Sequence, residues 1–399
     1  MNIFKKMGCR IYQGVFRIAM PMLPYREPIT IDSVLDIKSV LKSNNVHRVL
    51  LVTDKGIRDL GLTKSLEDDL REDKFTVIVY DGTVPNPTIA CIEEAREQYI
   101  AGQCEGIIAF GGGSVMDCAK IVGARIVKPN QPVSKMKGLL KINKKLPLLI
   151  AIPTTAGTGS ETTIAAVITD DKTHHKYPIN DFSLIPHYAV LDASLTLGLP
   201  KGLTATTGMD ALTHAIEAYI GHSTTKKTRA AALEACKLIL ENLPKAYANG
   251  KDKVARQNML RASYLAGIAF TRSYVGYVHA IAHSLGGKYG IAHGLANAVI
   301  LPYILNAFGA SAHKKLKEIA VHVGLTDEKT DNKVAASKLI NKIIELNTSM
   351  QIPNKLEGIK EKDIPALAIT ADKEANPLYP VPKLMSAKEL EEIYHLVKK

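Results

Sequence analysis

The sequence of 399 residues has no tryptophan and no uninterrupted apolar stretch long enough to form a transmembrane helix. No low-complexity segment or internal repeat is present, which excludes a disordered chain and a repeat protein. Its five cysteines are widely spaced without a CxxC pair, a pattern typical of a reduced compartment rather than a disulfide framework. We therefore expect a globular, cytoplasmic protein.

The positively charged residues are not concentrated in any one segment. The formal net charge is +12, but lysines and arginines are spread along the chain without an arginine-rich run or interleaved aromatic residues. This distribution favours a solvated basic surface that attracts small anionic ligands, and we expect no nucleic-acid partner.

Residues 1–25 form an N-terminal extension with the pattern of an amphipathic helix. Apolar side chains recur at helical spacing among basic ones: Met7, Ile11, Val15, Ile18 and Met22 among Lys5, Lys6, Arg10 and Arg17. Prolines at 21, 24 and 28 should end the helix. Such a helix can lie on a membrane surface or pack on the body of the protein or on a partner subunit, and packing is the prediction that we favour over membrane association.

Short apolar runs alternate with helical stretches after residue 46, which predicts an α/β domain over residues 26–199 with a parallel sheet. Strands are expected at 47–54, 75–82, 106–113 and 146–154, with edge strands at 165–170 and 187–192 separated by a loop that holds Lys176. After LPKG at 199–202 only helices are expected, at 205–220, 228–243, 252–270, 275–289, 294–308, 311–323 and 333–347. Residues 200–399 should therefore form an all-helical domain.

Two loops in the α/β domain have the composition of nucleotide-binding loops. GGGSVMDCAK at 111–120 follows a strand and opens a helix, where three glycines and unpaired N–H groups can accommodate a phosphate. TTAGTGSE at 154–161 is rich in hydroxyl groups. In a parallel sheet, ligands bind at the carboxyl ends of the strands, where both loops lie. A glycine triplet can also be only a tight turn.

Asp54 ends the first strand of the predicted sheet. Its carboxylate could accept hydrogen bonds from a ribose diol and repel a 2′-phosphate, or it could simply cap the following helix.

Histidines and an aspartate recur four apart in the helical part, as Asp210 with His214 and His279 with His283. Residues four apart lie on the same face of a helix, so two such pairs could enclose a divalent metal ion. A pair of this kind is more often a solvated face or a capped contact in the core. The alanine, isoleucine and leucine around both pairs indicate buried helices instead, where polar groups need partners.

The motifs GGGSVMDCAK, TTAGTGSE, TGMDALTHAIEAY and GYVHAIAHSLGGKYGIAHGLANAV together resemble the iron-dependent (group III) alcohol dehydrogenases, over nearly the whole chain from about Arg26. The resemblance implies a Rossmann-like domain followed by an all-helical domain, the fold shared with dehydroquinate synthase. It also implies a homodimer, a metal ion and NAD in preference to NADP, which the presence of Asp54 matches.

The resemblance further assigns individual residues. The metal ligands it implies are Asp210, His214, His279 and His293, with His283 as a catalytic residue beside the nicotinamide that is not a ligand. The cofactor contacts it implies are Gly112, Gly113, Ser114, Asp117, Thr154, Thr155, Thr158 and Lys176. Fe²⁺ follows from the likeness, although three imidazoles and a carboxylate suit Zn²⁺ as well.

The expected function is therefore that of an NAD- and metal-dependent alcohol dehydrogenase or aldehyde reductase (EC 1.1.1.-) acting on a small primary alcohol or aldehyde. One alternative is a zinc-dependent polyol dehydrogenase or a related lyase on the same fold. A non-enzymatic metal- or nucleotide-binding protein is another.

One geometric requirement follows from the ligand set. A straight helix from His279 to His293 would separate them by about 21 Å. The chain must therefore turn back between them, and we expect the bend at Gly286, Gly287 and Gly290.

Overall fold

The computed structural model describes residues 1, 3–19, 22–173 and 175–399. Within them the chain divides into two compact units, one formed by residues 24–198 and the other by residues 1–23 and 199–399. Pro21, where the N-terminal helix was expected to end, lies outside the described residues.

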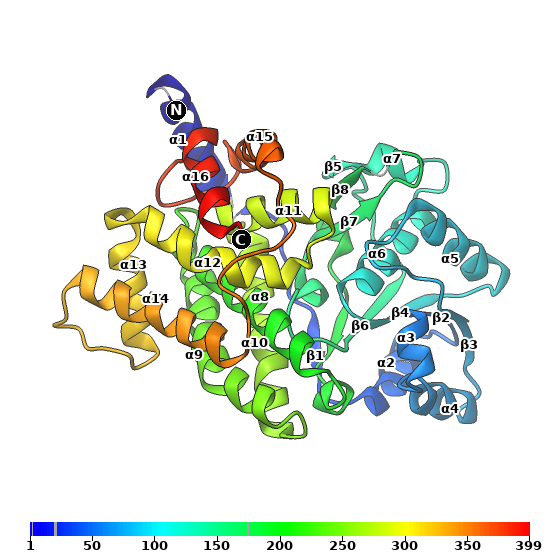
Figure 1. Cartoon of the computed structure of the whole chain (residues 1–399). Coiled ribbons are helices and arrows are strands. Elements are labelled where there is room, and N and C mark those ends of the chain that lie inside the picture. Colours follow the sequence, from blue (N-terminus) through cyan, green and yellow to red (C-terminus); the bar gives the residue numbers. More distant parts are fainter. Residues whose placement is uncertain (2, 20–21, 174) are drawn as a thin grey trace. The chain divides into compact units, whose positions relative to one another are not determined.

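The first unit is built on a six-stranded sheet in the order β1-β9-β6-β4-β2-β3, in which all neighbours are parallel (Figure 1). Its strands are β1 (Ile29–Ile31), β2 (Arg48–Val52), β3 (Thr76–Tyr80), β4 (Gly106–Gly111), β6 (Leu148–Pro153) and β9 (Tyr188–Val190). Its helices are α2 (Ile37–Ser43), α3 (Lys55–Asp59), α4 (Lys64–Glu72), α5 (Ile89–Ala101), α6 (Gly113–Val127) and α7 (Val133–Met136). The predicted parallel α/β architecture is confirmed.

Alternate residues of the central strands enter two separate apolar clusters. Leu50 and Ile107 belong to one cluster, whereas their chain neighbours Leu51 and Ile108 belong to the other. Successive side chains of a strand point to opposite faces, so both faces of this sheet are covered. This is why its strands read as continuous apolar runs.

The two predicted edge strands are placed differently from the expectation. β7 (Ala165–Thr169) belongs to a separate three-stranded sheet with β5 (Gly138–Leu139) and β8 (Lys176–Asn180), and β9 lies between β6 and the short strand β1. Lys176 is the first residue of β8 rather than part of a loop. The sequence concealed β8 because its exposed positions include Lys176 and Pro178, which do not suggest a strand.

The second unit consists of helices, as predicted (Figure 1). They are α1 (Ile3–Ala19), α8 (Lys201–Ile220), α9 (Lys226–Ala248), α10 (Lys253–Ser273), α11 (Tyr277–Tyr289), α12 (His293–Phe308), α13 (Ala310–His322), α14 (Asn332–Ser349), α15 (Ile364–Ala375) and α16 (Ala387–Val397). Among the described residues, no helix combines the length and apolar character that crossing a membrane requires.

Candidate active site

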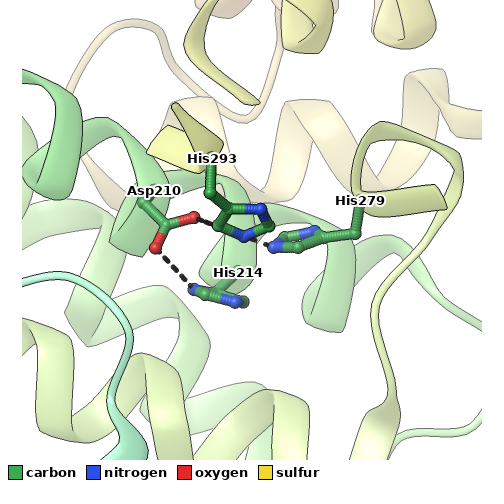
Figure 2. Close-up of side chains that lie close together, drawn as sticks. All are labelled: Asp210, His214, His279 and His293. Atoms are coloured by element: carbon green, nitrogen blue, oxygen red, sulfur yellow. Dashed lines mark ion pairs between the residues drawn. The ribbon is translucent and has the colours of Figure 1, made fainter. Parts of the chain in front are cut away.

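Four side chains of the helical unit converge on one point (Figure 2). Asp210 and His214 lie one turn apart on α8, His279 lies on α11, and His293 is the first residue of α12. Each offers one oxygen or nitrogen atom, and these four atoms all lie within 4.8 Å of one another. The structure thus brings together all four residues that the family resemblance implied as ligands.

The spacing of these atoms suits a divalent metal ion. Asp210 Oδ1 lies 3.4 Å from His293 Nε2 and 3.9 Å from His279 Nε2, and Asp210 Oδ2 lies 4.0 Å from His214 Nδ1. Ligand atoms that bind an ion tetrahedrally at about 2.0–2.2 Å are themselves about 3.4 Å apart. Three imidazoles and one carboxylate are also donors that Fe²⁺ and Zn²⁺ accept, so the residues fit such an ion.

Three of the four side chains are buried and the fourth is partly exposed. The side chains of Asp210, His214 and His279 are buried, whereas that of His293 is 38% exposed. Burial, and secondarily the neighbouring imidazoles, lowers the pKa of His279 well below its ordinary value, which keeps the ring in the neutral form that binds metals. A substrate can therefore approach on the His293 side.

The chain reverses between His279 and His293 at Gly290. That residue has a φ of 68°, the left-handed conformation that ends α11. The expected bend at Gly286 and Gly287 is wrong, because α11 continues through both to Tyr289. The packing of buried residues such as Leu285 outweighs the cost of about 1 kcal/mol for each glycine within a helix.

Close packing of α12 on α8 brings His293 to Asp210. A β-carbon on Gly294 would lie 2.4 Å from the backbone oxygen of Thr206 on α8, so only glycine permits this approach. The first turn of α12 therefore lies directly against the helix that carries the aspartate.

Glu217 orients His279. Its Oε2 atom lies 2.6 Å from His279 Nδ1 and accepts a hydrogen bond from Gly276 N, while Oε1 accepts one from Val278 N. A proton held on Nδ1 by the carboxylate directs the lone pair of Nε2 toward Asp210, an arrangement common around metal-binding histidines. Sequence reasoning missed Glu217, although it lies on α8 within the quoted motif TGMDALTHAIEAY.

Asn297 is a second residue that sequence reasoning missed. It lies one turn after His293 on α12 and is fully buried. Its Nδ2 atom donates to Asp210 Oδ1 over 2.6 Å and lies 3.2 Å from His279 Nε2. The i,i+4 spacing after a candidate ligand was the available signal. We infer that Asn297 holds the Asp210 carboxylate in place.

His283 lies next to the cluster in a separate hydrogen-bonded chain. Its ring stacks on that of His293 with centroids 5.1 Å apart, and its Nδ1 atom lies 2.6 Å from Glu374 Oε1. The hydroxyl of Tyr379 donates to the same carboxylate oxygen over 2.8 Å. Burial alone would raise the pKa of Glu374, but His283, Tyr379 and His293 together outweigh it and the pKa is lowered, which favours the ionised carboxylate. The roles of Glu374 and Tyr379 were not foreseen, although Tyr379 lies in the ANPLYPVPK stretch at 375–383 that also resembles the family, because these residues follow the histidines by some ninety positions.

The two predicted nucleotide loops follow neighbouring strands of the α/β unit. β4 pairs with β6 up to Gly111 and Pro153, and Thr154 N then donates to Gly111 O over 3.1 Å. Gly112 caps the amino end of α6, with Gly113 and Ser114 in its first turn, and Thr155 and Thr158 lie in the turns after β6. The loops therefore lie side by side, with the N–H groups of α6 between them.

Asp117 and Lys120 shape the second loop from within α6. Asp117 Oδ1 accepts from Ser160 Oγ over 3.0 Å, and its Oδ2 accepts from Val167 N over 3.0 Å. The buried Lys120 donates to Ser160 Oγ, to Thr163 Oγ1 and to the carbonyl oxygen of Ala165. Asp117 thus links the second loop, through Ser160, to β7, through Val167, and its contact with a cofactor stays a prediction.

Lys176 and Ser114 are linked by a residue that sequence reasoning missed. Lys176 Nζ donates to Asn86 Oδ1 over 2.6 Å, and Asn86 N donates to Ser114 Oγ over 3.2 Å. Asn86 follows β3 and precedes Pro87, which is a turn signal at a strand end.

Asp54 caps α3, since its Oδ1 accepts from Ile57 N over 2.9 Å. The helix-cap alternative is therefore realised, and the contact of Asp54 with a ribose stays a prediction.

Known proteins resemble this chain over nearly its whole length. The family model of iron-containing alcohol dehydrogenase matches residues 29–193, and that of the C-terminal part of the Fe-containing alcohol dehydrogenase family matches residues 204–397. The 1,3-propanediol dehydrogenase of Citrobacter freundii is 40% identical over 351 residues, covering 87% of this chain and 90% of that protein.

Solved structures agree. A structure of 1,3-propanediol oxidoreductase superposes with a TM-score of 0.89 at 36% identity, covering 93% of this chain and 98% of that one. The structure of sulfoacetaldehyde reductase from Bifidobacterium kashiwanohense in complex with NAD+ superposes with a TM-score of 0.84 at 29% identity, covering 94% of this chain and 98% of that one.

Proposed function

This chain belongs to the iron-containing alcohol dehydrogenase family, and we propose that Asp210, His214, His279 and His293 are its metal ligands. It is an NAD- and metal-dependent oxidoreductase that interconverts alcohols and aldehydes. The observation that carries the proposed ligand set is the convergence of one carboxylate and three imidazoles within 4.8 Å. A bound Fe²⁺ supplies Lewis-acid polarisation of the substrate oxygen.

His283 is proposed to transfer the proton of the reaction. Alcohol oxidation moves a hydride from the substrate carbon to the nicotinamide ring and releases the proton of the hydroxyl group. A proton on Nδ1, shared with Glu374, places the accepting lone pair of His283 on Nε2. Glu374 and Tyr379 then act as positioning residues that fix the ring and its tautomer.

The loops at 111–117 and 154–158, together with Lys176, are proposed to hold the dinucleotide. Their support is the amino end of α6, whose N–H groups suit a pyrophosphate, and the hydroxyl groups beside it. Hydride transfer then requires that the nicotinamide reach a substrate bound at the metal cluster.

Asp54 is proposed to set the preference for NAD. Replacing it by asparagine keeps the side-chain oxygen that caps α3 but removes the charge. At about 4 Å, like charges repel by about 1–4 kcal/mol, so kcat/KM with NADP should rise about tenfold or more while that with NAD changes little. Initial rates with both cofactors measure this, and Asp54→Ala, which also loses the cap, is the control for stability. An unchanged cofactor ratio in Asp54→Asn would place Asp54 away from the ribose.

Small primary alcohols and aldehydes are the proposed substrates. The relatives carry the names of 1,3-propanediol and sulfoacetaldehyde, which are both short molecules. A panel of short alcohols, diols and aldehydes with NAD, run on protein reconstituted separately with Fe²⁺ and Zn²⁺, tests substrate and metal together. Absence of an absorbance change at 340 nm with the whole panel would contradict the assignment.

We also propose a cytoplasmic homodimer. All five cysteines are free and buried, which suits a reducing compartment. The dimer rests on the family resemblance, and sedimentation of the full chain tests it.

Glu217 gives a test of the metal site that does not depend on turnover. Glu217→Gln keeps the volume but can no longer accept from His279 and from both backbone N–H groups at once. Loss of such an orienting partner typically weakens metal affinity by about 10–100-fold. Anaerobic titration against a competing chelator measures it, with Glu318→Gln, which removes the charge beside Tyr219 outside the cluster, as the matched control. Equal affinity in Glu217→Gln and wild type would remove Glu217 from the metal site.

A further inference from the structure

The N-terminal helix α1 packs on the helical unit through its polar face. Arg10 donates to the carbonyl oxygens of Val381 and Pro382 over 2.8 and 2.9 Å. Gln13, which is buried, donates to the carbonyl oxygens of Tyr379 and Pro377 over 2.8 and 3.1 Å. Two polar side chains thus fix the helix to the irregular segment 377–382.

Two contacts flank this polar face and complete the docking. Lys5 forms an ion pair of 2.9 Å with Asp372, and the ring of Phe16 lies 4.9 Å from that of Tyr274. The orientation of α1 is therefore set by specific bonds along the length of the helix.

The opposite face of α1 is apolar and exposed. It consists of six large side chains at helical spacing, each at least 60% exposed except Met7 at 56%: Ile3, Phe4, Met7, Ile11, Val15 and Ile18. A helix on the surface of a globular protein normally buries its apolar stripe and exposes its polar one. Here the arrangement is reversed, and a contiguous apolar stripe of this kind marks an interaction surface.

Charge identifies the kind of surface that α1 fits. Its sequence, IFKKMGCRIYQGVFRIA, contains no acidic residue. Lys6 and Arg17, which take no part in the docking bonds described above, are exposed on the helix. Basic residues beside an exposed apolar stripe match the interface of an anionic membrane, where the apolar side chains enter the acyl boundary and the basic ones meet lipid headgroups.

A second copy of the chain fits this face less well. Helix against helix, it would cover a strip of about 26 Å by 10 Å, well below the roughly 800 Å² that each partner buries in a stable interface. It would also bring Lys6 and Arg17 of both copies together with no acidic residue on α1 to oppose them.

We propose that the apolar face of α1 docks the enzyme reversibly on an anionic lipid surface. The hydrogen bonds of Arg10 and Gln13 hold the helix on the body of the protein. Its apolar stripe is therefore already exposed to solvent before the protein binds lipid. A single amphipathic helix gives weak and reversible binding, because stable anchoring takes a second signal.

Co-sedimentation of the full-length protein with lipid vesicles tests the proposal. We expect binding to vesicles of phosphatidylcholine mixed with phosphatidylglycerol, and little to vesicles of phosphatidylcholine alone. Binding should weaken by about fivefold for each of Lys6→Gln and Arg17→Gln, and it should fall with rising salt. Equal binding to both kinds of vesicle, or to neither, would overturn the proposal.

Variants of the apolar face separate lipid from protein partners. Ile11→Glu with Ile18→Glu should lower vesicle binding by more than about tenfold, while NAD-linked activity and thermal stability stay unchanged. Val254→Glu, at an apolar position of α10 that is 71% exposed, is the matched control and should bind vesicles like wild type. If the double variant instead dissociates the protein in lipid-free sedimentation, the face belongs to a second copy and the lipid proposal fails.

Discussion

Replacing His279 by alanine is expected to abolish both metal binding and NAD-linked alcohol oxidation. His279 supplies one of the four converging ligand atoms and is fixed by Glu217. Loss of about 4 kcal/mol of Lewis-acid stabilisation corresponds to about a thousandfold in rate. Metal content by elemental analysis and activity at 340 nm, both after anaerobic reconstitution, measure the effect.

Two further variants make the His279 result interpretable. The alanine variant leaves the carboxylate of Glu217 buried without its imidazole, which could destabilise the fold. His293→Ala removes a proposed ligand that is partly exposed, so it should lose the metal with little effect on the stability of the fold. His322→Ala, at the exposed end of α13, is the control for loss of an imidazole elsewhere. A His279→Ala protein that keeps its metal and full activity would disprove the proposed ligand set.

Replacing His283 by alanine is expected to lower kcat by about 100-fold or more while leaving metal content unchanged, since general acid–base residues contribute about 10²–10⁴. His283 lies beside the cluster but outside the four ligands. One ionisation should disappear from the pH dependence of kcat, and added imidazole should restore part of the rate. Steady-state kinetics over a range of pH, together with metal analysis, test this.

Glu374→Gln and Tyr379→Phe distinguish proton transfer from packing. Both substitutions keep the size of the side chain but weaken the hydrogen bonds that run from Tyr379 through Glu374 to the ring of His283. If His283 transfers the proton, Glu374→Gln should lower kcat less than His283→Ala and displace the same ionisation. If His283→Ala loses metal instead of the ionisation, His283 is part of the metal site and the proposed role is wrong.

The fold could be predicted closely from the sequence wherever local pattern decides structure. Continuous apolar runs gave the positions of β2, β3, β4 and β6, because both faces of the sheet are covered. The same reasoning failed for β8, whose exposed Lys176 and Pro178 do not resemble a strand, and for β1, which has only three residues. These strands form because they pair with segments that are distant in the sequence, and a local sequence pattern does not predict such pairing.

The site was predictable only in part. Helical spacing suggested that Asp210 would share a face with His214, and His279 with His283, but only the family resemblance implied His293, in place of His283, as the fourth ligand. Spacing could not do so, because the turn at Gly290 and the contact of Gly294 with Thr206 determine where His293 lies. Glu374 reaches His283 from α15, far along the chain.

The sequence by itself determined the family, the parallel sheet, the helical unit and the residue types of the metal cluster, because each depends on motif or on periodicity along the chain. Only the tertiary structure decided which side chains orient the proposed ligands and His283, since Glu217, Asn297 and Glu374 act through contacts between helices. It also decided the orientation of α1. The sequence showed an amphipathic helix, but the hydrogen bonds of Arg10 and Gln13 bury its polar face and leave its apolar face exposed.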